Sequence, residues 1–212
     1  VGTFQFFAAR KDVEATRLLS DHVMARHYPA TLHAEQPYLA LLRAVIERQA
    51  ELIARWQGIG FIHGVMNTDN SSIAGETIDY GPCAFMDSYD PATVFSSIDH
   101  NGRYAYGNQP SIAHWNLIQL AQALLPILDN SATADDDSAV AIAQEAINAF
   151  PAQFLTAYQT IIKDKLGLSE FKDSDDALSQ TLLSIMEVQK SDFTLCFRRL
   201  AELSNETACI NN

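Results

Sequence analysis

Residues 63–70 read HGVMNTDN, and residues 77–82 read TIDYGP. Short apolar runs around these two motifs are interrupted by glycines, which is typical of loops and very short strands. Loops that present polar side chains at fixed positions are common places for binding and catalysis. We therefore take residues 60–90 as the candidate functional region, set among segments with helical patterns.

The spacing of these residues follows that of a protein-kinase catalytic loop, His-x-Asp-x-x-x-x-Asn followed by Asp-Phe-Gly. His63, Asn70 and the triplet Asp79-Tyr80-Gly81 fall in register with that pattern. In kinases the Asn and the second Asp hold divalent metal against the nucleotide phosphates, and Mg²⁺ prefers such oxygen ligands. The spacing predicts a hairpin over residues 71–78, turning at Gly75, that brings Asn70 and Asp79 together.

One position departs from the kinase pattern, because Val65 stands where a kinase has its catalytic Asp. Valine cannot accept a proton, so either the chemistry is lost or a nearby carboxylate has taken the role. Asp69 is the only acidic residue within the loop, and it could accept a proton from an attacking hydroxyl. A structural interpretation stays open, in which Asp69 and Asn70 simply form a turn and His63 braces the loop backbone.

Other motifs in this region fail on spacing. The glycines between 58 and 64 do not fit the dinucleotide-binding fingerprint, because the third comes one residue late and the run follows a helical segment. His63, Cys83 and His100 lack the paired spacing of a zinc site. We expect Asp87, Asp90, Asp99 and His100 to cap and brace loops.

The charge of the chain is strongly acidic and unevenly distributed. The sequence has 14 basic and 26 acidic residues, a formal net charge of −12, which argues against nucleic-acid and anionic-membrane partners. From Trp56 to Ile162 the only basic residue is Arg103, against eleven acidic residues. No apolar run approaches the roughly 20 residues that span a bilayer. With three cysteines and no secretory signal pattern, we expect a cytoplasmic location.

Hydrophobic periodicity predicts helices over most of the rest of the chain. The predicted segments are Phe6–His27, Tyr38 to about Gly58, Pro110–Leu128, 138–149, 151–166, 175–189 and 192–203. We interpret residues 130–137 as a polar connector, and Trp115 with its neighbouring leucines as core. The predicted fold class is mainly α with a small β-hairpin insert.

Four segments together resemble the selenoprotein O / YdiU family: HGVMNTDN (63–70), TIDYGP (77–82), FMDSYDP (85–91) and DHNGRYAYGNQPSIAHWNLIQLAQAL (99–124). The resemblance implies the C-terminal lobe of a protein-kinase-like fold that transfers AMP from ATP to Ser, Thr or Tyr hydroxyls of proteins. Carried over by position, Asp69 is then the proton acceptor, Asn70 and Asp79 are Mg²⁺ ligands, and Asp79 also lies near the nucleotide. Some members of the family are described as using UTP with Mn²⁺.

The resemblance also sets the expected extent of the domain. We expect residues 1–212 to form a single partial domain, with the catalytic and metal-binding loops at 60–90 and a helical remainder at 108–205. The N-lobe and the far C-terminus of the family are then absent, so we expect the chain alone to be inactive. Two alternatives stay open: a small-molecule phosphotransferase of the aminoglycoside-kinase type, and a non-catalytic pseudokinase that serves as a binding module.

Overall fold

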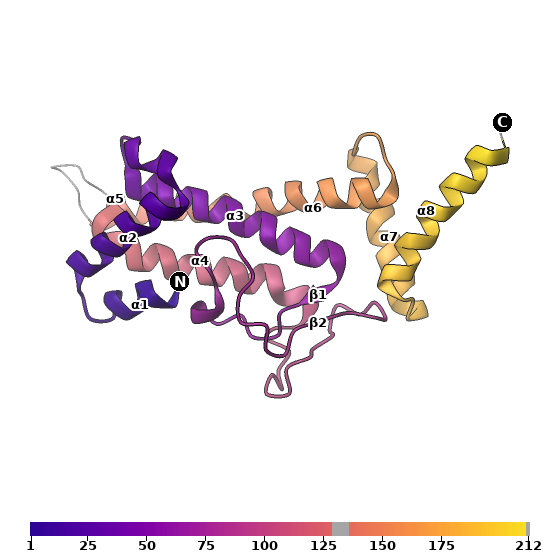
Figure 1. The fold of residues 1–212 in the computed structure, drawn as a ribbon, viewed down its shortest axis with the longest axis horizontal. Helices are drawn as coiled ribbons and strands as arrows, with labels where there is room; N and C mark the ends of the chain where they lie inside the picture. Colours follow the sequence, from indigo (N-terminus) through magenta and orange to yellow (C-terminus); the bar gives the residue numbers. More distant parts are fainter. Residues whose placement is uncertain (129–135, 211–212) are drawn as a thin grey trace. The chain divides into compact units, whose positions relative to one another are not determined.

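The computed structural model describes residues 1–128 and 136–210, with side chains for 1–128 and 137–202. The described residues are mainly helical and include one two-stranded antiparallel sheet (Figure 1). They form two compact units. The first unit comprises Val1–Leu52, Met66–Tyr80 and the described part of Pro110–Phe154; the second comprises Ile53–Val65, Gly81–Gln109 and the described residues from Leu155 onward. The predicted connector at 130–137 lies largely outside the described residues.

The helices follow the predicted periodicity closely. They are α1 (Gly2–Ala8), α2 (Val13–His27), α3 (Pro37–Ile59), α4 (Gln109–Leu128), α5 (Asp136–Asn148), α6 (Phe150–Leu166), α7 (Asp173–Gln189) and α8 (Phe193–Ile210), with 3-10 turns η1 (Pro29–His33), η2 (Thr68–Asn70) and η3 (Tyr106–Asn108). Among the described residues, no helix combines the length and the apolar character needed to cross a membrane.

The segment predicted as one helix from Phe6 to His27 is two helices in the structure. Lys11 has a φ of 55°, a left-handed conformation that ends α1. The carboxylate of Asp12 then accepts a hydrogen bond from the backbone N–H of Ala15 at 3.0 Å and caps the start of α2. The periodicity missed this break because the polar residues at 10–12 are compatible with an exposed helical turn.

Helix α3 buries the face that the sequence predicted. Leu41, Leu42 and Val45 are fully buried, and Leu52 is half-buried. The helix ends at Ile59 because Gly60 adopts a φ of 71°, which is the usual way to terminate a helix.

Helix α4 begins at Gln109 and places Pro110 in its first turn, as predicted. Leu117, Leu120 and Leu124 are buried, so the apolar stripe is core. The assignment of Trp115 to the core is wrong, because its side chain is 39% exposed. Trp115 is two positions from Leu117, which at 100° per residue places it on the other side of the helix.

The sheet lies in the second unit and joins two strands, β1 (Phe61–Ile62) and β2 (Ala84–Phe85). Phe61 pairs with Phe85 and Ile62 with Ala84 in antiparallel register. The loop that carries the motifs therefore leaves β1 and returns at β2. The side-chain amide of Gln109 extends the sheet, because it donates to the carbonyl of Phe61 and accepts from the N–H of His63, both at 2.9 Å.

The core of the second unit is aromatic. Tyr89, Tyr106 and Phe193 are buried together with Ile62, and the rings of Tyr89 and Phe193 stack with centroids 5.8 Å apart. Lys165 of α6 also enters this region, where its Nζ donates to the carbonyl of Gly58 at 2.6 Å near the end of α3. Burial lowers the pKa of Lys165 to about 8, although its cation also lies 4.5 Å from the ring centroid of Phe193.

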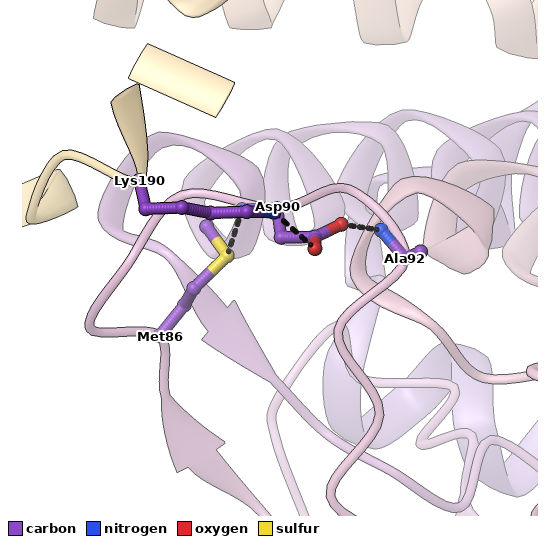
Figure 2. Close-up of polar contacts among 4 residues, drawn as sticks. All are labelled: Met86, Asp90, Ala92 and Lys190. Carbon is purple, nitrogen blue, oxygen red and sulfur yellow. Dashed lines mark hydrogen bonds and ion pairs between the residues drawn. The ribbon is translucent and has the colours of Figure 1, made fainter. Parts of the chain in front are cut away.

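The loop after β2 is fastened to the α7–α8 connection within the second unit. The backbone N–H of Tyr89 donates to Ser191 at 2.9 Å, and that of Phe193 donates to Asp87 at 2.7 Å. Figure 2 shows the polar contacts of Asp90, whose carboxylate accepts hydrogen bonds from Lys190 Nζ at 2.9 Å and from the N–H of Ala92 at 2.9 Å. The prediction that Asp90 braces a loop is confirmed.

Replacing Gln109 with leucine should lower the free energy of unfolding by about 2–4 kcal/mol. The substitution leaves the N–H of His63 and the carbonyl of Phe61 without their buried partner, and each such loss costs roughly 1–3 kcal/mol. Urea denaturation of the purified chain measures the change. Gln122→Leu, an exposed glutamine on the same helix, is the matched control. A loss below about 1 kcal/mol for Gln109→Leu would contradict the assigned role.

The Asp90–Lys190 pair should contribute stability at neutral pH and none in acid. Hydrogen bonds from Lys190 and from the Ala92 N–H lower the pKa of Asp90 below its ordinary value of 3.8. A lowered folded-state pKa gives stability that is present above 3.8 and disappears as the pH falls through the folded-state pKa. A double-mutant cycle of Asp90→Asn and Lys190→Met should give a coupling below about 1 kcal/mol at pH 7, because both side chains are partly exposed. Coupling that persists after the carboxylate is protonated would be inconsistent with an ion pair.

Candidate functional site

His63 opens the loop as a structural residue. Its side chain is fully buried and stacks on Trp56, with ring centroids 5.3 Å apart. The N–H of Val65 points toward His63 Nδ1 at 3.4 Å, a long hydrogen bond within the loop. These contacts confirm the interpretation that His63 braces the loop backbone. They also leave no exposed atom of His63 to bind a ligand.

Asp69 and Asn70 lie on the 3-10 turn η2 of the first unit. The turn is closed by hydrogen bonds from the N–H of Asn70 to the carbonyl of Asn67 at 3.0 Å and from Ser71 to Thr68 at 3.4 Å. Asp69 is exposed and Asn70 is half-buried. The turn that the structural interpretation predicted is therefore present, and the same turn presents the Asp69 carboxylate to solvent.

The predicted hairpin over residues 71–78 is wrong. The segment contains no strand; its chain reverses in a turn closed by a hydrogen bond from the N–H of Gly75 to the carbonyl of Ser72 at 3.2 Å. The turn does lie at Gly75, where a φ of 72° and the closeness of Arg48 require glycine: a Cβ would come within 2.8 Å of Arg48 Cβ.

Side chains of neighbouring helices take the place of a second strand. Gln49 Nε2 of α3 donates to the carbonyl of Ser72 at 2.7 Å, and Arg48 donates to the carbonyl of Ala74 at 3.1 Å. The hydroxyl of Tyr28, which directly follows α2, donates to the carbonyl of Ile73 at 2.5 Å. Because these carbonyl groups are already paired with side chains, the segment needs no strand partner.

Asp79 has an unusual backbone conformation. Its φ is 55°, in the left-handed region that is uncommon for residues other than glycine, although Asp tolerates it better than most. Its side chain is exposed, as is that of Tyr80, which follows it. Strained backbone of this kind concentrates at functional sites, so the conformation supports a functional interpretation of Asp79.

The three predicted site residues, Asp69, Asn70 and Asp79, all belong to the first compact unit. Together they offer one amide and two carboxylate groups, the oxygen donors that suit a hard divalent cation. Within the described residues there is no cluster of three or more His, Cys, Asp or Glu side chains arranged to hold a metal. Mg²⁺ usually takes one or two carboxylates and fills its other positions with water and substrate phosphates, so the chemistry of these three side chains is compatible with Mg²⁺.

Two residues that the sequence did not point to hold the loop directly before Asp69. Gln5 of α1 accepts a hydrogen bond from the hydroxyl of Thr68, and Asn116 of α4 donates to the carbonyl of Met66 at 3.1 Å. Both come from segments about 50 or more positions away in the chain. A side-chain amide in an apolar helix is a weak sequence feature, and no local pattern gives the partner that it will meet.

Comparison with known proteins finds relatives along nearly the whole chain. A family model described as "Protein adenylyltransferase SelO" matches residues 1–211. A protein of Methylorubrum populi named protein nucleotidyltransferase YdiU is 62% identical over 201 residues, which are 95% of this chain and 40% of the relative. Proteins of the same name from Rhodopseudomonas palustris and Bradyrhizobium diazoefficiens are 60% and 59% identical, over 95% and 98% of this chain and 40% and 42% of their own length.

The chain thus spans about two fifths of the length of these curated relatives. The match of the family model extends over every segment on which the sequence resemblance was based. The chain belongs to the SelO family.

Proposed function

We propose that the full-length protein to which this chain corresponds transfers AMP from ATP to Ser, Thr or Tyr hydroxyls of proteins, with Mg²⁺ as cofactor. The observation that carries the proposal is the loop of residues 63–70, which presents Asp69 on η2 within a chain of the SelO family. The name of the family model, protein adenylyltransferase, supports AMP transfer, and that of the relatives supports transfer of a nucleotidyl group.

Asp69 is the proposed proton acceptor. In the reaction the oxygen of the substrate hydroxyl forms a bond to the α-phosphorus, the bond from that phosphorus to the bridging oxygen breaks, and pyrophosphate leaves. The hydroxyl proton passes to the Asp69 carboxylate. The exposed position of Asp69 suits this role, because the acceptor must come within about 2.6–3.2 Å of a hydroxyl on another protein.

Asn70 and Asp79 are the proposed Mg²⁺ ligands, and Asp79 also lies beside the nucleotide in this proposal. When bound, the cation would neutralise phosphate charge. Neutralisation is needed, since Arg103 is the only basic residue between Trp56 and Ile162. Further positive charge would come from basic residues outside this window. Mn²⁺ with UTP is the alternative pair of cofactor and nucleotide.

The kinase-like architecture and a cytoplasmic location belong to the same proposal. The order of a helical lobe, a catalytic loop and a following Asp-Tyr-Gly segment supports a kinase-like C-lobe. Cys83 and Cys196 are free thiols, which is the usual state in a reducing compartment.

Two alternatives are distinguished by the product. A small-molecule phosphotransferase would add phosphate, whereas an adenylyltransferase adds AMP, and the mass of the modified substrate separates the two. A pseudokinase that only binds would give no covalent product. Val65, which cannot accept a proton, favours the adenylyltransferase and the pseudokinase over an ordinary kinase.

Asp79→Asn in the full-length protein should abolish AMP transfer, because the substitution removes the negative charge of a proposed metal ligand. The measurement is incorporation of labelled AMP into protein over a range of Mg²⁺ concentrations. Asp87→Asn is the matched control, since Asp87 is exposed in the same acidic region and its backbone carbonyl, which the substitution keeps, accepts the hydrogen bond from Phe193. Undiminished labelling by Asp79→Asn would refute the site.

Asp69→Asn should reduce kcat by about 10²–10⁴-fold while leaving the KM for ATP nearly unchanged. The amide keeps the size of the carboxylate but cannot accept the proton. Steady-state kinetics on the full-length protein measure both constants. The control is Glu76→Gln, which removes an exposed carboxylate a few residues along the loop. A kcat for Asp69→Asn within about threefold of the unsubstituted protein would rule out Asp69 as the base.

A further inference from the structure

The side chains of Gln5 and Asn116 form hydrogen bonds to Thr68 and Met66, the chain segment that leads to Asp69. On one side, the hydroxyl of Thr68 donates to Gln5 Oε1, and Gln5 Nε2 in turn donates to Gln119 Oε1 at 3.0 Å. This chain of contacts runs from η2 through α1 to α4. It fixes Thr68, the first residue of η2, to a helix whose apolar face is core.

On the other side, Asn116 of α4 donates to the carbonyl of Met66 at 3.1 Å. Asn116 is only 2% exposed, so this hydrogen bond is shielded from water. Asn116 and Gln119 are three positions apart and therefore lie on the same side of α4. A single helix face thus holds both Met66 and, through Gln5, Thr68.

Helix α1 also lies directly against the backbone of Asp69. A Cβ built on Gly2 would come within 2.9 Å of Asp69 Cα, closer than real Cβ atoms approach. The contact is therefore between backbones, and the Asp69 side chain is left exposed. Helix α1 therefore lies against the Asp69 backbone, and the hydrogen bonds to Met66 and Thr68 hold the chain just before it.

The amide of Asn116 makes only part of the hydrogen bonds that it could make. Its Oδ1 is buried and has no hydrogen-bond partner among the described residues. An unsatisfied buried acceptor costs roughly 1–3 kcal/mol; a leucine of similar size would remove this cost but would leave the Met66 carbonyl without its donor. The gain from Asn116 is therefore positional, through its donor to Met66.

We propose that Asn116 and the Gln5–Thr68 pair are positioning residues that hold the Asp69 carboxylate in the geometry for proton transfer. The inference rests on the proposed role of Asp69 as base. None of these three residues touches the reacting atoms; they act through the backbone of Met66 and of η2. A displacement of a catalytic group by about 1 Å can cost about 10²-fold in rate, so loosening either anchor should lower kcat more than substrate affinity.

The test uses the full-length protein with Thr68→Val and Asn116→Leu. Thr68→Val keeps the shape of the side chain and removes the donor to Gln5, so it perturbs folding little. We expect each variant to lower kcat about tenfold, with the KM for ATP changed less than twofold. Thr68→Ser, which keeps the hydroxyl, should recover most of kcat. Gln122→Leu, an exposed glutamine on α4, should match the unsubstituted protein.

Hydrogen exchange gives a readout that does not depend on activity. The N–H groups of Asn70 and Ser71 close η2, so exchange at these two positions should become faster in Thr68→Val and Asn116→Leu and stay unchanged in Gln122→Leu. In an Asp69→Asn background the two substitutions should cause no further loss of kcat, because they act through Asp69.

The outcomes separate this inference from the proposed function. If Asp69→Asn is inactive but Thr68→Val and Asn116→Leu keep kcat within twofold, the positioning role is wrong and the proposed base stands. If the two variants lose the same factor in the Asp69→Asn background, their effect is not exerted through Asp69 and the inference also fails. If Asp69→Asn retains full activity, both the base and its positioning are overturned.

Discussion

The candidate site depends on how an irregular loop satisfies its backbone hydrogen bonds. Between β1 and β2 the described chain forms only one short 3-10 turn, so most of its N–H and carbonyl groups cannot pair within a helix or strand. Side-chain amides supply many of the partners: Gln109 for β1 and His63, Asn116 for Met66, and Gln49 for Ser72. A loop held in this way can have a fixed backbone while single side chains, such as that of Asp69, remain exposed.

The acidic segment between Trp56 and Ile162 contains both carboxylates of the candidate site. Asp69 and Asp79 are both exposed, and the region that contains them has Arg103 as its only basic residue. Exposed carboxylates cost little desolvation, so this surface can carry both of them without burying a charge. A site with this charge would repel a bare triphosphate and accept one that is neutralised by a cation, in agreement with the proposed use of metal-bound nucleotide.

Much of the secondary structure could be predicted from the sequence because the helices bury regular faces. Leu41, Leu42 and Val45 recur at helical spacing, and α3 buries them as expected. The predictions that were wrong have local physical causes. A left-handed Lys11 divides the first helical segment, and Trp115, although apolar, lies on the exposed side of α4. The hairpin at 71–78 was wrong because side chains of α3, not a strand, pair with its carbonyl groups.

The sequence by itself determined the family, the positions of most of the helices and the candidate site residues Asp69, Asn70 and Asp79. Motif spacing and helical periodicity are local properties, so a linear reading can recognise them. Only the tertiary structure decided how the loop is held, because Gln5 and Asn116 meet it from segments far away in the chain. Hydrogen bonds of this kind depend on the packing of α1 and α4 around η2, and no periodicity in the sequence encodes which amide meets which backbone group.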